Sequence, residues 1–322
     1  MVKNLKDLMA KFKDEAACRD YLVKQRWNGK PVCPYCSCDR SYVIENGKRF
    51  KCANKECWKK YSVTVGTIFE ASNIPLSTWF PAVYFITAHK KGISSVQLAK
   101  NLGVTQKTGW FMLHRIRESL REKAPLLLGK EVQADETYVG GLEQNKHQRK
   151  RAKDGHEANS NKMPVVGLIE TGGRVVTKVM PWITKKAMEE LILTHIERPA
   201  VLVTDGLASY TKVGRKFDHV IINKDAGQRK VGKFHTNGIE NYWSQFSRML
   251  HGTYHQISDK HLQRYCDEMS YRFNSRKDHD GFRFLLTFHQ IEGRLTYKNL
   301  ITDGENYKKS GGYPIEEIET GE

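Results

Sequence analysis

The sequence predicts an α/β protein whose strand-and-helix layer is preceded by a small cysteine-rich unit and a helical region. Four paired cysteines fall within residues 33–57, and residues 75–124 read as helices broken at Gly92 and Gly103. From about residue 130, strand-like runs alternate with helical ones, which is the pattern of an α/β layer. At 322 residues, the chain is long enough for about two domains with real hydrophobic cores.

The composition points to a polyanionic partner. Lys and Arg number 53 against 36 Asp and Glu, a net charge of +17, and such residues bind phosphates by releasing counterions. Charge alone does not separate nucleic acid from an acidic lipid surface. The longest uncharged stretch, residues 71–88, holds Asn73, Pro75 and Pro81 and cannot span a bilayer, and residues 1–15 lack the apolar block of a signal peptide. We therefore expect a cytoplasmic, nucleoid-associated protein with no membrane partner.

The first 65 residues divide into two segments. Residues 1–30 read as one amphipathic helix and a linker, because Leu5, Leu8, Met9 and Phe12 recur at helical spacing. Residues 31–65 form the cysteine-rich unit, in which the alternating runs 41–44 and 61–65 predict short strands.

The cysteine spacing of this second segment predicts a structural zinc ion. Two pairs, one separated by two residues and one by four, supply the four thiolates of a closed tetrahedral site: Cys33, Cys36, Cys52 and Cys57. Cys38 is a competing ligand, and reduced structural thiols without metal are the alternative. The segment is accordingly interpreted as a zinc ribbon that binds Zn²⁺.

Residues 66–125 form the helical region, and residues 94–117 within it have the pattern of a helix-turn-helix. Gly103 makes the turn and Thr105 can cap the second helix. One apolar stripe is expected to be buried: Val96, Ala99 and Leu102. Three residues at the start of the second helix are left to reach a DNA groove: Gln106, Lys107 and Thr108. An ordinary αα-hairpin is the alternative.

Residues 126–285 hold the α/β layer, and residues 286–322 are a C-terminal extension with an acidic tail. Strands are expected at 131–139, 163–169, 174–180 and 200–204. Helices are expected at 184–197, 206–213, 238–251 and 258–274.

Three carboxylates of the α/β layer form a candidate metal site. Asp135 stands within a strand, where its burial is costly without a cation, and Asp205 ends a short apolar strand. Glu240 opens an amphipathic helix. Taken singly, each has an ordinary alternative: a salt-bridged surface residue, a turn or a helix cap. Together they can converge on a pair of Mg²⁺ or Mn²⁺ ions of the kind that promote phosphodiester displacement.

Two basic segments flank these acids. Residues 145–153 contain five basic residues and no acid, and residues 224–233 contain four basic residues and one acid. We expect them to follow a DNA backbone, with plain solvated loops as the alternative. The residues expected to contact DNA here are Arg149, Lys150, Arg151, Arg229 and Lys230.

Three blocks around the acids resemble those of DDE transposases, more narrowly of insertion sequences related to the eukaryotic Merlin transposons. The blocks are Asp135-Glu-Thr-Tyr-Val-Gly-Gly141, Thr204-Asp-Gly-Leu-Ala-Ser-Tyr210 and His235-Thr-Asn-Gly-Ile-Glu-Asn-Tyr-Trp-Ser244. The resemblance covers most of residues 30–280 in the family's order. It implies an RNase H-like mixed sheet flanked by helices. It also implies that Asp135, Asp205 and Glu240 are the catalytic metal-binding triad, with His235 beside the third acid.

The resemblance further implies a transposase that binds terminal inverted repeats and catalyses metal-dependent DNA cleavage and strand transfer. Its partners would be transposon ends, target DNA and further copies of itself. One position departs from the family, because a lysine commonly found seven residues after the third acid is Ser247 here. Arg248 is an imperfect substitute, since one residue rotates a helical side chain by about 100°. Two other functions stay open: a regulator with an inert catalytic domain, and a structure-specific nuclease.

Overall fold

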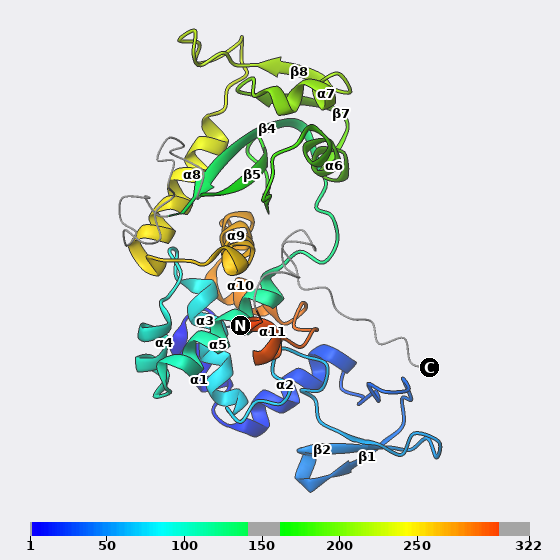
Figure 1. The fold of residues 1–322 in the computed structure, drawn as a ribbon. Coiled ribbons are helices and arrows are strands. Elements are labelled where there is room, and N and C mark those ends of the chain that lie inside the picture. Colours follow the sequence, from blue (N-terminus) through cyan, green and yellow to red (C-terminus); the bar gives the residue numbers. More distant parts are fainter. Residues whose placement is uncertain (1, 141–161, 303–322) are drawn as a thin grey trace. The chain divides into compact units, whose positions relative to one another are not determined.

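The computed structural model describes residues 2–140 and 162–302, which pack into two compact units (Figure 1). The first unit combines the chain up to Arg121 with Ser275–Ile301, and the second contains Glu122–Asn274. The five-part division expected from the sequence stays a prediction. No helix in the described ranges has both the length and the apolar character needed to cross a membrane.

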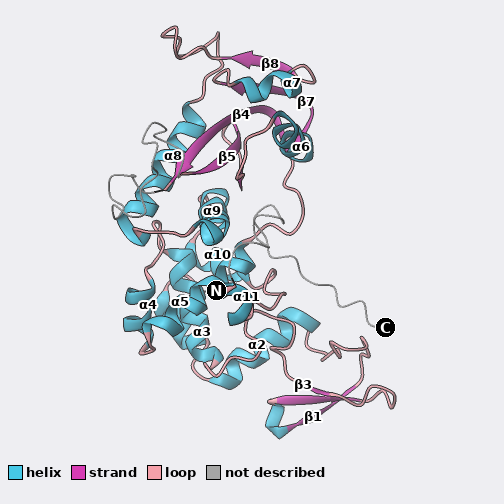
Figure 2. Cartoon of the chain, in the orientation of Figure 1, coloured by secondary structure: helices cyan, strands magenta, loops and turns pink. Residues whose placement is uncertain are grey.

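The first unit is mainly helical (Figure 2). Its helices are α1 (Leu5–Lys11), α2 (Glu15–Trp27), α3 (Leu76–Ala88), α4 (Ser95–Leu102), α5 (Gln106–Leu120), α10 (Asp280–Thr287) and α11 (Tyr297–Ile301). The expectation of a single helix over residues 1–30 is wrong. The chain leaves the helix at Phe12, and the Asp14 carboxylate then accepts the Ala17 N–H and caps a second helix.

An aromatic core joins both sequence segments of the first unit. The Phe80 ring on α3 lies 4.7 Å from the ring of Phe12 and 4.7 Å from that of Phe288, which in turn lies 4.8 Å from the Phe284 ring. A backbone hydrogen bond from Ile68 N–H to the Ile291 carbonyl, at 2.8 Å, adds to this closure. The stretch after residue 275 therefore completes a core begun near the N-terminus.

The cysteine-rich segment forms a small antiparallel sheet. Its strands are β1 (Ser41–Ile44), β2 (Arg49–Cys52) and β3 (Lys60–Tyr61), in that order. The expected run at 61–65 contributes only its first residue to β3. Trp27 at the end of α2 packs edge-on against Phe50 and Tyr61, which anchors the sheet to the helix before it.

Helices α4 and α5 are joined by the expected turn, with Gly103 at a φ of 66° and Thr105 capping α5. The predicted apolar stripe is wrong in part, because Val96 is 51% exposed while Leu98 is fully buried. The cause is close packing at Gly109, where an added Cβ would meet the Ser95 carbonyl oxygen at 2.9 Å. Because α5 packs closely against α4 at Gly109, the side of α4 that carries Leu98 faces the core, and the side that carries Val96 does not.

The second unit is built on a mixed five-stranded sheet. Its strands are β4 (Leu128–Val139), β5 (Met163–Glu170), β6 (Val175–Val179), β7 (Ile196–Thr204) and β8 (Asp218–Ile221). The order is β6-β5-β4-β7-β8, with β4, β7 and β8 parallel and β5 antiparallel to both of its neighbours. Its helices are α6 (Lys185–His195), α7 (Thr211–Gly214), α8 (Asn237–Met249) and α9 (Asp259–Asn274).

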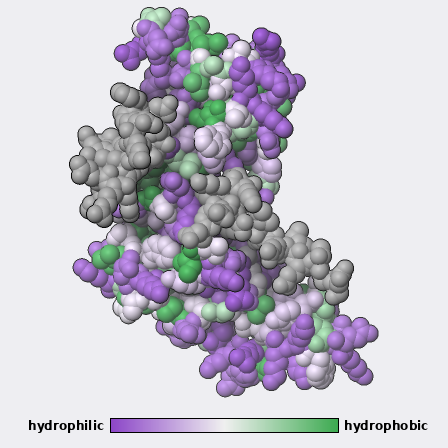
Figure 3. Space-filling model, in the orientation of Figure 1, coloured by the Kyte–Doolittle hydropathy of each residue, from purple (hydrophilic) through white to green (hydrophobic). Residues whose placement is uncertain are grey.

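Each face of this sheet carries its own core. Met188, Leu191 and Ile192 of α6 pack on one face, while α8 and α9 cover the other (Figure 1). On the face of the molecule drawn in Figure 3, apolar residues lie as separate spots among hydrophilic ones. This sheet flanked by helices, together with the cysteine-rich segment, confirms the predicted α/β class and is consistent with an RNase H-like fold.

The second unit also differs from the sequence expectation in detail. Strand β8 was not predicted, and the helix expected at 206–213 is a 3₁₀ turn (Ala208–Tyr210) followed by the short α7. Strand β8 is only four residues long and has no fully buried side chain, so it lacks the apolar run that marks its neighbour β7.

Gly167 of β5 controls how closely α8 approaches the sheet. A Cβ added there would lie 2.6 Å from Trp243 Cζ2 and 2.8 Å from Ile239 Cδ1. We expect Gly167→Ala to lower the free energy of unfolding by about 1–3 kcal/mol, because overpacking forces α8 to shift. Urea unfolding followed by circular dichroism measures this loss. Gly129→Ala on β4 is the matched control, since its Cβ would meet only ordinary contacts at 3.8 Å; an equal loss in both variants would contradict the explanation.

Candidate active site and metal centres

The parallel pairing of β4 with β7 brings two of the predicted acids together. Gln133 pairs with Val203, and Asp135 and Asp205 each lie two residues further along the chain. They therefore stand at the same level of the sheet, where β7 ends. Carboxylate oxygens of Asp135, Glu136 and Asp205 all lie within 4.8 Å of one another.

The third acid is held near them by the start of α8. The buried Gln133 side chain accepts the Ile239 N–H at 3.1 Å, which ties α8 to β4 two residues before Asp135. Gly238 permits this contact, because a Cβ there would lie 2.7 Å from Gln133 Oε1. Gln133 is thus a positioning residue that sequence reasoning missed.

Glu240 follows directly and stays outside the group of three carboxylates. Its Oε1 receives the Lys224 ammonium at 2.7 Å and the Thr236 hydroxyl at 2.9 Å. The hydrogen bond from Lys224 lowers the pKa of Glu240. The structure therefore brings two predicted acids together and pairs the third with a lysine.

Burial disfavours the ionised forms of Asp135 and Glu136. Desolvation raises the pKa of Asp135 to about 6, with Lys224 opposing the rise and Asp205 adding to it. Desolvation and the neighbouring charges of Asp205 and Asp135 raise the pKa of Glu136 to about 7. The buried Tyr210 hydroxyl donates to Glu136 at 3.3 Å. A group of hard oxygen donors with excess negative charge fits a divalent cation such as Mg²⁺ or Mn²⁺.

Glu136 was missed by the sequence analysis because successive side chains of a strand point to opposite faces. An acid next to Asp135 was therefore not expected to share its site. At the end of β4, however, the two carboxylates approach each other. The sequence signal for this arrangement was the adjacency of Asp135 and Glu136 at the start of the first transposase-like block.

Of the other residues predicted to act near the acids, those that the structure describes lie on α8 or in the segment before it. His235 is half-buried, and its Nδ1 makes no hydrogen bond within the part of the chain that the structure describes. Arg229 and Lys230 are exposed in the segment before α8, and the Arg229 charge helps to lower the pKa of Glu240. Arg248, like Ser247, is exposed on α8. Arg149, Lys150 and Arg151 lie outside the described residues.

The predicted DNA-reading residues stand at the start of α5. Gln106 and Lys107 are exposed, and Thr108 is half-buried. The Gln106 side chain donates to the Ser95 hydroxyl at 2.9 Å, and the Lys107 ammonium lies 5.1 Å from the centre of the Tyr297 ring.

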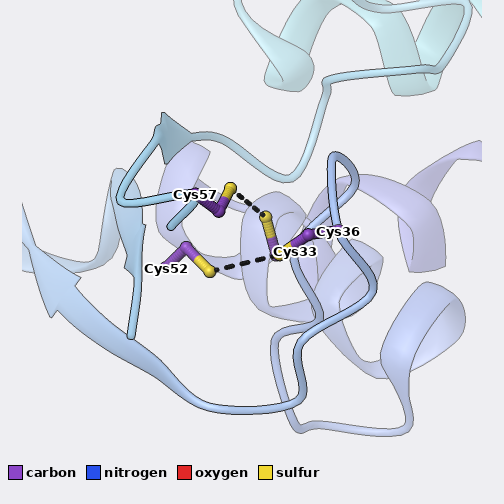
Figure 4. Close-up of side chains that lie close together, drawn as sticks. All are labelled: Cys33, Cys36, Cys52 and Cys57. Atoms are coloured by element: carbon purple, nitrogen blue, oxygen red, sulfur yellow. Dashed lines mark hydrogen bonds between the residues drawn. The ribbon is translucent and has the colours of Figure 1, made fainter. Parts of the chain in front are cut away.

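The four predicted zinc-binding thiols converge (Figure 4). Cys33 Sγ lies 3.7 Å from Cys57 Sγ, and Cys36 Sγ lies 3.5 Å from Cys52 Sγ, with all four sulfurs within 4.8 Å of one another. Cys38 is not part of this group, and its thiol faces the Arg40 carbonyl at 3.5 Å. Four soft sulfur donors at this spacing suit a structural Zn²⁺ ion.

Two regions of the chain match known domain families. Residues 127–274 match the ISXO2-like transposase domain, and residues 13–60 match the transposase zinc-ribbon domain. The first match contains every acid of the candidate active site, and the second contains all four clustered cysteines. The chain therefore carries an ISXO2-like transposase domain and a transposase zinc-ribbon domain. These matches confirm the resemblance to insertion-sequence transposases found in the sequence.

The chain is also similar to two known proteins. It is 28% identical over 255 residues to an uncharacterized protein in transposable element ISH50 of Halobacterium salinarum, covering 74% of this chain and 84% of that protein. The structure also matches a chain in the complex of the simian T-cell lymphotropic virus intasome with the PP2A regulatory subunit B56 gamma, at 14% identity and a TM-score of 0.28. That match covers 54% of this chain and 63% of the other chain, less than two thirds of its length.

The sulfur cluster predicts different outcomes for two cysteine variants. Cys52→Ser removes a buried thiolate from the cluster, so purified protein should lose its bound zinc. Cys38→Ser should keep one equivalent per chain, because Cys38 lies outside the cluster. Metal analysis after dialysis measures both. Loss of zinc from Cys38→Ser with retention in Cys52→Ser would reverse the ligand assignment.

The raised pKa of Asp135 predicts how stability depends on pH. A carboxyl whose pKa is higher folded than unfolded favours its protonated form in the native state, so its contribution is lost as pH rises from about 4 to about 6. Asp135→Asn removes this contribution. In metal-free buffer, the variant should gain stability relative to wild type by on the order of 2 kcal/mol between pH 4 and pH 7. Urea unfolding across this range measures it; parallel wild-type and variant profiles would contradict the assignment.

Proposed function

We propose that this transposase binds the terminal inverted repeats of its insertion sequence, cleaves DNA there and joins the released ends to target DNA. The observation that carries the proposal is the convergence of acids from β4 and β7, with Glu240 on the adjoining start of α8. These elements belong to the ISXO2-like transposase domain. An active enzyme is favoured over a regulator with an inert catalytic domain, because all three predicted acids are present and two of them lie together.

The residues of the site have distinct roles in the proposed reaction. Asp135, Asp205 and Glu240, with Glu136 beside them, would hold divalent cations. When bound, such cations stabilise the charge that develops on the phosphodiester and activate the attacking oxygen. Burial of Asp135 and Glu136 keeps water from screening these charges, and the Tyr210 hydroxyl fixes the orientation of Glu136. His235 lies one residue before Thr236, which orients Glu240.

DNA binding in this proposal uses basic and polar groups of both units. The net charge of +17 supplies sequence-independent affinity, while Gln106, Lys107 and Thr108 at the start of α5 read bases. Arg229, Lys230 and Arg248 contact the DNA backbone, and the same role is proposed for Arg149, Lys150 and Arg151. Because two element ends must be joined, we propose that the protein acts as a homo-oligomer. Its working place is the cytoplasmic nucleoid.

Substitution of the second acid tests the proposed chemistry. Asp205→Asn removes a cation ligand but keeps the side-chain shape, so cleavage of a duplex carrying the element's terminal repeat should slow by about 1,000-fold or more in Mg²⁺. This follows because several kcal/mol of transition-state stabilisation are lost. Gel analysis of end-labelled DNA measures cleavage, and a mobility shift should show that DNA binding persists.

Asp218→Asn is the matched control, because Asp218 is an exposed acid at the start of the neighbouring strand β8. It should cleave at the wild-type rate. Undiminished cleavage by Asp205→Asn would overturn the proposed role of the acids. Equal cleavage of repeat and non-repeat duplexes by the wild-type protein would instead indicate a nuclease without end recognition.

A further inference from the structure

Lys224 reaches the acids because of the way the chain leaves β8. The Ile222 N–H donates to the Thr204 carbonyl at 2.8 Å, so the pairing of β8 with β7 continues to the residue beside Asp205. Lys224 follows two residues later. The next turn is closed by hydrogen bonds from Gly227 N–H to the Lys224 carbonyl at 2.9 Å and from Asn223 N–H to Gln228 Oε1 at 3.0 Å. The backbone of Lys224 is thereby fixed at the edge of the site.

The Lys224 side chain acts on acids from three different elements. Its ammonium lies 2.7 Å from Glu240 Oε1 on α8. Its charge also interacts with Asp135 on β4 and with Asp205 after β7. One lysine therefore offsets part of the negative charge that the fold concentrates here.

The ion pair between Lys224 and Glu240 cannot persist throughout the proposed reaction. Divalent cations held by the acids would bring like charge to within a few ångströms of the ammonium, where repulsion in a partly buried site is strong. A DNA phosphate beside the acids would instead attract the ammonium. The Lys224 side chain is 39% exposed and has a flexible four-carbon stem, so it can leave Glu240 without unfolding the turn.

We propose that Lys224 is the counterion of Glu240 in the resting protein and moves to the reacting phosphodiester when divalent cations and DNA occupy the acid site. The inference rests on the proposed function, since it needs both cations and DNA at these residues. Lys224 then has two opposite effects: it competes with metal for the acids, and it stabilises the negative charge of the phosphate during cleavage.

Metal binding tests the first effect without any measurement of activity. Free Mn²⁺ is titrated by electron paramagnetic resonance against the full chain, with the zinc ribbon already loaded with Zn²⁺. Lys224→Gln should bind Mn²⁺ roughly tenfold more tightly, because one partly exposed charge interaction changes an equilibrium by about that factor. Lys224→Arg keeps the charge and should bind as wild type does. Lys185→Gln removes the same charge from an exposed position on α6 and should also stay close to wild type.

DNA cleavage at saturating Mn²⁺ tests the second effect. Lys224→Gln should cleave the terminal-repeat duplex about tenfold more slowly or worse, and Lys224→Arg should recover part of the rate. Thermal melting of each variant verifies that it is folded. Tighter Mn²⁺ binding together with slower cleavage is a combination that a merely structural lysine does not produce.

The outcomes separate this inference from the proposed function. Wild-type Mn²⁺ affinity in Lys224→Gln, or wild-type cleavage by that variant, overturns the role of Lys224 while leaving the metal site in place. Wild-type Mn²⁺ affinity in Asp205→Asn overturns the metal site itself. Loss of affinity in Asp205→Asn with a gain in Lys224→Gln supports both.

Discussion

The candidate active site depends on the parallel hydrogen-bond register between β4 and β7. Pairing of Gln133 with Val203 sets Asp135 level with Asp205. The same Gln133 accepts the Ile239 N–H, so one buried amide links the strand of the first acid to the helix of the third. A slip of β4 by one residue would point Asp135 to the opposite face and remove the support of α8. The arrangement of the acids is therefore specified by backbone pairing.

The fold concentrates negative charge at this point and compensates it only in part. Asp135 and Glu136 have raised pKa values because they are buried beside other carboxylates, whereas Glu240 has a lowered one because Lys224 pairs with it. Metal-site carboxylates carry such strain in general, because ligands arranged for a cation repel one another without it. The site is thus electrostatically prepared for positive charge, and Lys224 supplies part of that charge.

Much of the arrangement could be predicted from residue patterns. The strand positions of Asp135 and Asp205 follow from apolar alternation and from short buried runs, and the cysteine cluster follows from spacing alone. Glu240 could be named as a candidate, but its place beside the strands could not be derived, since this is a long-range contact that no local pattern encodes. The places of Glu136 and Lys224 in the site could not be predicted, because the first depends on how β4 ends and the second on the turn after β8. The burial of Leu98 in place of Val96 could not be predicted for a related reason, since it depends on the close contact between α4 and α5 at Gly109.

The discontinuity of the first unit has a consequence for synthesis of the chain. Its core joins Phe12 and Phe80 to Phe284 and Phe288, so the unit with the helix-turn-helix cannot finish folding on the ribosome until the sequence of the second unit has been translated. A message truncated after α9 would yield the acids without a completed helical unit.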